Sequence, residues 1–71
     1  MDNKIKEGSV KFWRVYKGLT QERLAELCNV TTQTIHNIES YKVPMSKAMR
    51  CLLAKIFKIS EEDIFTPYEI K

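Results

Sequence analysis

The segment that follows Ser46 constrains the fold of this chain most, because its apolar residues recur at the spacing of an α-helix. A broad apolar face at positions i, i+3, i+4, i+7 and i+8 is formed by Met49, Leu52, Leu53, Ile56 and Phe57. Val43-Pro44 interrupts any earlier helix, and Ser46 is a suitable N-cap. A helix with so wide an apolar face needs other elements to cover it, so the remaining segments are expected to pack against it.

Two short helices are expected in the first half of the chain. Residues 9–17 begin with Ser9 as N-cap, carry apolar residues at helical spacing, and end at Gly18, which suits left-handed geometry. A second helix opens with Thr20 as its N-cap and stops at Asn29. Asn is one of the few residues other than Gly that tolerates a positive φ, so a tight turn follows the second helix.

A third helix is expected over residues 32–40, with Thr31 as its N-cap. Ile35 and Ile38 are its only strongly apolar residues, and they are three positions apart. Such a helix buries one narrow stripe and presents its polar side chains to solvent or to a partner.

The end of the chain is expected to carry a short fifth helix. Residues 60–63, SEED, resemble a capping box with Asp in place of Glu, and Pro67 limits the length of the helix. Residues 67–71 form a tail that is either a short strand or a docking segment, and residues 1–8 form a flexible lead-in. These patterns predict one all-α domain of five helices over residues 9–66.

Composition narrows the class of protein. A chain of 71 residues has room for one domain, and it shows neither a signal peptide nor a membrane-spanning stretch, so a cytoplasmic location with no membrane partner is expected. Twelve Lys and Arg against nine Asp and Glu give a net charge of +3, which mildly favours an anionic partner. Cys28 and Cys51 are interpreted as small core residues and not as a disulfide framework.

A short helix, a three-residue turn and a polar helix make a helix-turn-helix unit over residues 20–40. Its sequence, TQERLAELCNVTTQTIHNIE, closely resembles the XRE-like family of Cro and repressor proteins, whose usual pattern is TQxxLAxxxGVSxxTISxIE. The shared residues are Thr20, Gln21, Leu24, Ala25, Val30, Thr34, Ile35, Ile38 and Glu39. The resemblance covers residues 10–65 and implies a compact lambda-repressor-like fold. Tyr41 and Lys58 depart from it, since relatives mostly carry Gly at the first position and Gly or Asn at the second.

The resemblance implies a sequence-specific transcriptional regulator that binds double-stranded DNA with its third helix in the major groove. Base contacts are then expected from Thr32, Gln33, His36 and Asn37. Phosphate contacts are expected from Gln21, Thr31, Lys42, Ser46 and Lys47. Repression would follow from occupancy of an operator, and no cofactor or metal is implied.

Two further expectations concern structure. The resemblance implies a partly buried salt bridge between Arg14 and Glu39, which ties the first helix to the end of the third. A homodimer would read two half-sites, and its contacts are expected from Ile64, Phe65, Tyr68 and Ile70. In the alternative arrangement, Ile64 and Phe65 complete the core of the monomer.

Two other classes of function were weighed. A phage-type antirepressor or an antitoxin would keep this fold and use the neutral third helix to bind a protein such as a cognate repressor. An enzyme or a metal protein would have to use His36, Cys28, Cys51 and the acidic trio Glu61, Glu62 and Asp63. The single His lacks a ligand at metal-like spacing and the trio is explained by a helix start, so no catalytic site is expected.

Overall fold

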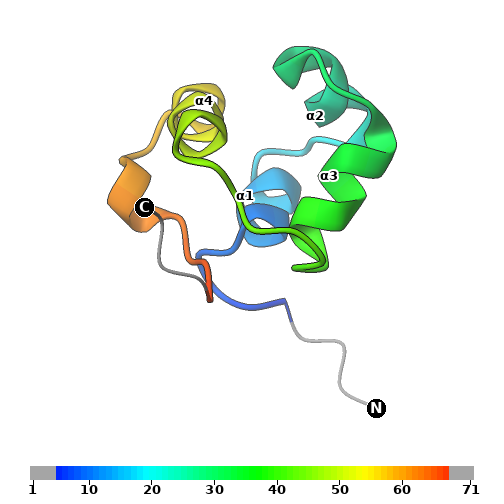
Figure 1. Ribbon diagram of the computed structural model, residues 1–71. Helices are drawn as coiled ribbons and strands as arrows, with labels where there is room; N and C mark the ends of the chain where they lie inside the picture. Colours follow the sequence, from blue (N-terminus) through cyan, green and yellow to red (C-terminus); the bar gives the residue numbers. More distant parts are fainter. Residues whose placement is uncertain (1–4, 68–71) are drawn as a thin grey trace.

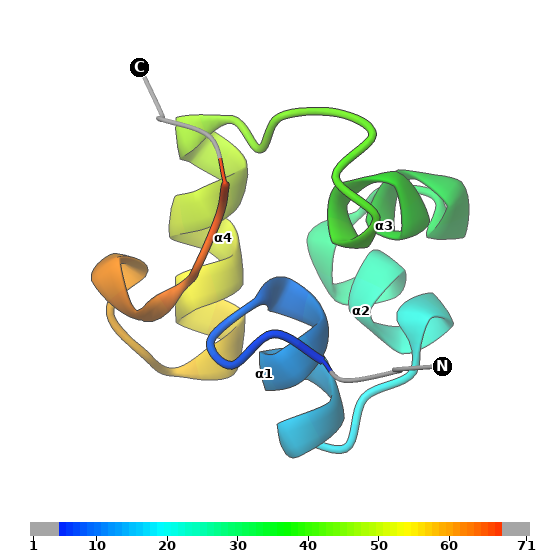
Figure 2. The same cartoon turned by 90° about the horizontal axis from the view of Figure 1, so that it is seen from below.

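The computed structural model describes residues 5–67, and within them the chain is helical without strands. The helices are α1 (Val10–Tyr16), α2 (Gln21–Cys28), α3 (Thr32–Glu39) and α4 (Lys47–Phe57), followed by the short helix η1 (Glu61–Asp63). Figures 1 and 2 show α1 between α4 on one side and the α2–α3 pair on the other, and α1 contacts both α3 and α4.

Each of the four α-helices begins at a hydroxyl side chain, as the sequence predicts. The side-chain oxygens of Ser9, Thr20, Thr31 and Ser46 each accept a hydrogen bond from the backbone N–H three residues further on. Each cap therefore satisfies one of the backbone donors that a helix start leaves without a partner. These local bonds fix where the short helices begin.

The predicted fifth α-helix is wrong in type: η1 is a single 3₁₀ turn of three residues, and Ser60 makes no side-chain capping bond. The chain leaves the turn at once because Ile64, which is 1% exposed, enters the core in an extended conformation. The next residue, Phe65, donates its backbone N–H to the carbonyl of Gly8 at 2.7 Å. Because Ile64 is buried in an extended conformation and Phe65 is bonded to Gly8, the helix cannot continue beyond Asp63. Of the predicted tail, only Pro67 lies within the described residues.

The core lies where α4 meets the other helices. Its fully buried large side chains are Phe57, Leu24, Ile35, Leu53 and Ile64. The predicted apolar face of α4 packs into this core: Leu53 and Phe57 are buried, and Met49, Leu52 and Ile56 are partly buried against it. Cys28 is buried as predicted, whereas Cys51 is only half-buried, so the prediction of a core position is wrong for Cys51.

Within residues 5–67, three residues other than Gly adopt left-handed backbone geometry, with φ of 60° at Asn29, 61° at Tyr41 and 60° at Lys58. Asn29 ends α2 in this conformation, as predicted, and Lys58 ends α4 in the same way. Tyr41 follows the C-cap of α3. The backbone thus follows the path that a Gly would favour at Tyr41 and Lys58, at a steric cost of about 1 kcal/mol for each larger residue.

Candidate nucleic-acid interface

Helix α3 buries a narrow apolar stripe and exposes the rest of its surface. Ile35 and Ile38 are its buried residues, with exposed fractions of 0% and 6%. Of the predicted base-contacting residues, Thr32, Gln33 and His36 are exposed and Asn37 is half-buried. The structure therefore leaves three of the four fully accessible and Asn37 partly accessible.

Two of these polar side chains contact each other. The Nε2 of Gln33 donates a hydrogen bond to the Oδ1 of Asn37 at 3.0 Å, so the two amides lie one helical turn apart in a defined arrangement. A carboxamide carries two donor hydrogens and an acceptor oxygen. This bond therefore leaves Gln33 with one N–H and its carbonyl oxygen, and Asn37 with both of its N–H donors. The pair can therefore present both donors and acceptors outward from α3.

The orientation of α3 depends on close packing against α2. Ala25 is 3% exposed and lies on the buried face of α2, and the backbone N–H of Val30 bonds back to its carbonyl at 3.0 Å. A small side chain here lets two helices approach each other closely. At the start of α3, the Oγ of Thr31 contacts both the N–H and the hydroxyl of Thr34. The packing of α2 against α3 is thus set by the backbone hydrogen bond of Val30 and by the small side chain of Ala25.

A polar cluster joins α1, α2 and the end of α3. The Nε of Arg14 donates to the carboxylate of Glu39 at 2.5 Å, and the second guanidinium contact is 3.2 Å long. The side chains are only 11% and 4% exposed. Arg14 also donates to the carbonyl of Leu19, and Gln21 donates its Nε2 to the same carboxylate at 3.0 Å. The hydrogen bonds of Glu39 therefore hold the C-terminal end of α3 against α1 and α2.

The predicted phosphate-contacting residues are distributed around α3. Thr31 and Ser46 use their hydroxyls as N-caps, and the side chain of Gln21 is held by Glu39. Lys42 and Lys47 are exposed. Lys42 lies in the connection that runs from α3 to the start of α4, which Figure 2 shows spanning the space between these helices.

Lys11 was missed by the sequence analysis. It lines a hollow of 170 Å³ together with residues of the helix-turn-helix unit, namely Gln21, His36, Glu39 and Ser40. Lys11 is exposed and lies one turn before Arg14 on α1. The i, i+3 spacing could have predicted this position of Lys11. The sequence analysis expects Arg14 to contact the end of α3, and a residue three positions earlier lies on the same face of α1.

His36, Cys28, Cys51 and the acidic trio Glu61, Glu62 and Asp63 are the residues that a metal or catalytic site would have to use. Among residues 5–67, no three His, Cys, Asp or Glu side chains lie close enough together to hold a metal ion. Burial raises the pKa of the Cys28 thiol, which opposes formation of a reactive thiolate. No helix in this part of the chain is long and apolar enough to cross a membrane.

Comparison with known proteins agrees with the helix-turn-helix geometry. The sequence profile of the helix-turn-helix family HTH_3 matches residues 10–64, so the chain belongs to this XRE-type family of transcriptional regulators. It is 39% identical over 59 residues to the uncharacterized HTH-type transcriptional regulator MJ0272 of Methanocaldococcus jannaschii, covering 83% of this chain and 89% of that protein. It is 35% identical over 65 residues to the uncharacterized HTH-type transcriptional regulator YgzD of Bacillus subtilis, covering 92% and 91%.

Proposed function

We propose that this protein is a sequence-specific DNA-binding regulator that inserts α3 into the major groove and represses transcription by occupying an operator as a homodimer. The observation that carries the proposal is the surface of α3, which exposes Thr32, Gln33 and His36 and buries only Ile35 and Ile38. The family of the chain, and the printed names of its two relatives as HTH-type transcriptional regulators, support the same function.

We assign base recognition mainly to Gln33 and Asn37. Gln33 and Asn37 can each contact adenine through two hydrogen bonds, and their mutual bond holds them one turn apart before DNA arrives. Thr32 can place its methyl group against thymine at the start of α3. His36 faces the same hollow as Lys11, so its contact is either a base edge or a nearby phosphate.

Phosphate contacts from Lys or Arg must come from outside the recognition surface, because α3 contains neither residue. Lys42 and Lys47 are exposed beyond its C-terminal end, and Lys11 lies beside it on α1. Gln21 starts α2, where backbone N–H groups and the helix dipole favour an anion. One of its two side-chain amide hydrogens is used by Glu39, which orients the other for a phosphate oxygen.

Dimerisation is proposed because one helix in one groove contacts only a few base pairs, and two half-sites multiply specificity. Ile64 is buried and completes the monomer core, which was the alternative left open by the sequence. Phe65 is 36% exposed and is the remaining apolar candidate, with the ammonium of Lys6 4.8 Å from its ring centroid. The other two candidates, Tyr68 and Ile70, lie outside the described residues.

The test is selection of bound DNA from random-sequence and gene-upstream pools across a salt series. Enrichment of a two-fold symmetric site, with affinity falling steeply as salt rises, is the expected result. Gln33→Ala should weaken specific binding by about 1–3 kcal/mol, whereas Lys47→Ala should weaken all sequences alike. Lys55→Ala, in the last turn of α4, is the matched control for loss of one Lys and should leave binding unchanged. Equal, sequence-independent losses in the first two variants would contradict the role of Gln33.

The absence of Lys and Arg from α3 favours a second candidate function. A phage-type antirepressor or an antitoxin would use the same neutral surface of Thr, Gln, His and Asn to bind a protein partner such as a cognate repressor. Binding of this kind responds much less to salt than binding through several phosphates. Failure to retain any DNA at low salt would reject the regulator and select this second function.

A further inference from the structure

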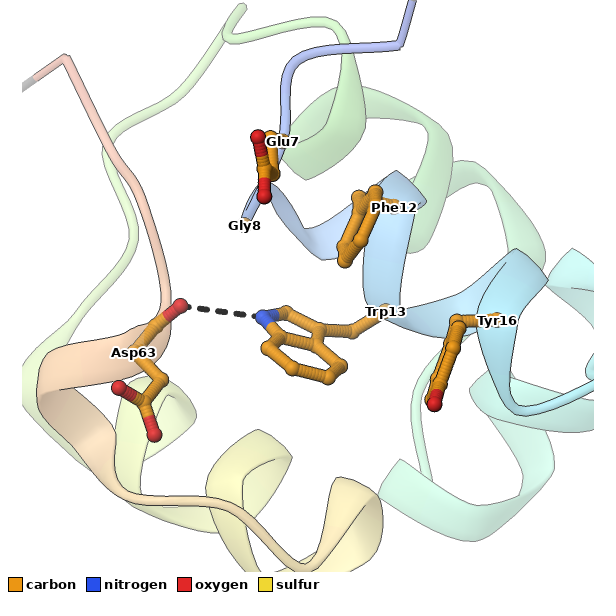
Figure 3. A pocket seen from close by; sticks show the side chains of 6 residues that line it. All are labelled: Glu7, Gly8, Phe12, Trp13, Tyr16 and Asp63. Carbon is orange, nitrogen blue, oxygen red and sulfur yellow. Dashed lines mark hydrogen bonds between the residues drawn. The ribbon is translucent and has the colours of Figure 1, made fainter.

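A second hollow is lined by residues of α1, of η1 and of the segment before α1 (Figure 3). Figure 1 shows η1 and α3 on different sides of α1. Its volume is 380 Å³, which falls within the range of small-molecule sites, about 300–1,000 Å³. It is lined by Glu7, Gly8, Phe12, Trp13, Tyr16 and Asp63. We propose that this pocket binds a small organic cation of the quaternary ammonium class, a function separate from DNA binding.

Three aromatic rings supply the first part of the argument. The rings of Phe12 and Tyr16 are nearly parallel, at 10° with centroids 6.1 Å apart. The indole of Trp13 is almost perpendicular to both, at 82° and 89°, with centroids 5.2 and 5.8 Å away. Aromatic faces attract a cation that lies within about 6 Å of the ring centroid, and Trp attracts it best. A trimethylammonium group in this pocket would contact more than one face.

The exposure of these rings argues against a purely structural role. Tyr16 is 70% exposed and Phe12 is half-buried, and neither belongs to the core, whereas the half-buried Trp13 packs against the core with part of its ring. Tyr16 already attracts a cation within the chain, since the ammonium of Lys17 lies 5.7 Å from its ring centroid. Exposed aromatic surface gathered at a hollow is typical of a binding site.

The charged residues that line the pocket favour a positively charged ligand. Although the whole chain carries +3, the charged residues that line this pocket, Glu7 and Asp63, are both acidic. Figure 3 shows Glu7 at the end near Phe12, whereas Asp63 directs its backbone carbonyl to the indole nitrogen of Trp13 and turns its carboxylate away from the rings. Glu7 would therefore attract a cation more strongly than Asp63, whereas an anion would be repelled and a neutral molecule would gain no charge interaction.

The pocket is built before any ligand arrives. The indole N–H of Trp13 donates to the backbone carbonyl of Asp63 at 3.0 Å, which fixes the ring (Figure 3). The bond between Phe65 and Gly8 holds the chain before α1 against the segment after η1. Gly8 has a φ of +85°, and a Cβ there would lie 3.3 Å from the carbonyl oxygen of Asp63. Glycine thus permits the close approach that forms the walls, and pre-organisation lowers the cost of binding.

Trp13 reports directly on this proposal, because it is the only Trp of the chain and it lines the pocket. The probe is choline, compared with 3,3-dimethyl-1-butanol, which has the same shape without the charge. Titration of the full chain at constant ionic strength should give a saturable change in Trp13 fluorescence with choline. The neutral analogue should bind at least about tenfold more weakly, as the loss of a desolvated cation–π contact predicts.

Variants separate a charged site from a merely apolar one. Glu7→Gln should weaken choline binding about threefold or more, Asp63→Asn should weaken it less, and neither should affect the neutral analogue. Tyr16→Leu should weaken choline binding while helix content, measured by circular dichroism, stays unchanged, because Tyr16 is exposed. The matched control is Glu62→Gln, since Glu62 is an exposed carboxylate of η1 that does not line the pocket.

Three results would overturn the proposal. One is the lack of a saturable fluorescence change with choline, and another is equal binding of choline and its neutral analogue. The third is an equal loss in Glu62→Gln and Glu7→Gln, which would mean that the net charge of the protein, and not the pocket, attracts the ligand.

Discussion

Removal of one partner of the Arg14–Glu39 pair should cost far more stability than the loss of an exposed ion pair, because it leaves a buried charge unpaired. Glu39→Gln keeps the shape of the side chain but leaves the guanidinium of Arg14, 11% exposed, without a counter-charge. Loss of one partner from a buried pair costs about 3–5 kcal/mol, and the partial exposure of Arg14 places the expected loss near about 3 kcal/mol. A domain of this length is stable by roughly 4–10 kcal/mol, so the variant should lose a large part of its stability.

A double-mutant cycle isolates the interaction of the two side chains. Arg14→Met keeps the apolar stem of the side chain, and the double variant leaves neither charge buried alone, so we expect a coupling free energy of about 2 kcal/mol or more. Urea unfolding followed by circular dichroism measures each variant. Glu26→Gln is the control, because the Arg23–Glu26 side chains are 57% and 69% exposed and their pair should contribute less than about 0.5 kcal/mol. A coupling free energy between Arg14 and Glu39 as small as that of the control would refute the reasoning.

Three shorter predictions concern the backbone and the core. Lys58→Gly should raise the free energy of unfolding by about 0.5–1 kcal/mol, because Gly adopts the left-handed conformation without strain. Asn29→Gly should change this free energy less, and urea unfolding of both variants tests the difference. Ala25→Leu should cost about 1–3 kcal/mol by forcing α2 from α3, and a thermal midpoint equal to that of the parent would contradict it. Burial raises the pKa of Cys28 above 9.0, so the folded state retains a proton that the unfolded chain releases. Stability should therefore fall as pH rises above 9.0, and this fall should be absent in Cys28→Ala when unfolding is measured across alkaline pH.

The sequence predicts the four α-helices well because their signals are local. Each helix start has a hydroxyl N-cap within the segment itself, and the apolar face of α4 repeats at helical spacing. The narrow stripe of Ile35 and Ile38 likewise follows from spacing alone, and it determines which side of α3 stays exposed. Local pattern is therefore enough for the elements and for the orientation of the candidate DNA surface.

The errors arise where distant segments meet. The type of η1 depends on Ile64 reaching the core and on the bond between Phe65 and Gly8, and neither can be derived from residues 60–63. Lys11 joins the hollow beside Gln21 and His36 only because α1 packs next to the helix-turn-helix unit. The aromatic pocket was missed for the same reason, since Asp63 lies fifty residues beyond Trp13 in the chain. Contacts of this kind need the tertiary arrangement.

Helix α1 contributes residues to both proposed sites, on opposite faces. At about 3.6 residues per turn, Lys11 and Arg14 fall on one side, whereas Phe12, Trp13 and Tyr16 fall on the other. The first side holds the end of α3 through Glu39, and the second forms the wall of the pocket. Because the side chains of the two faces share only the backbone of a short helix, Tyr16→Leu should change cation binding and leave operator binding intact. Loss of DNA binding in that variant would mean that the pocket side of α1 also controls the position of α3.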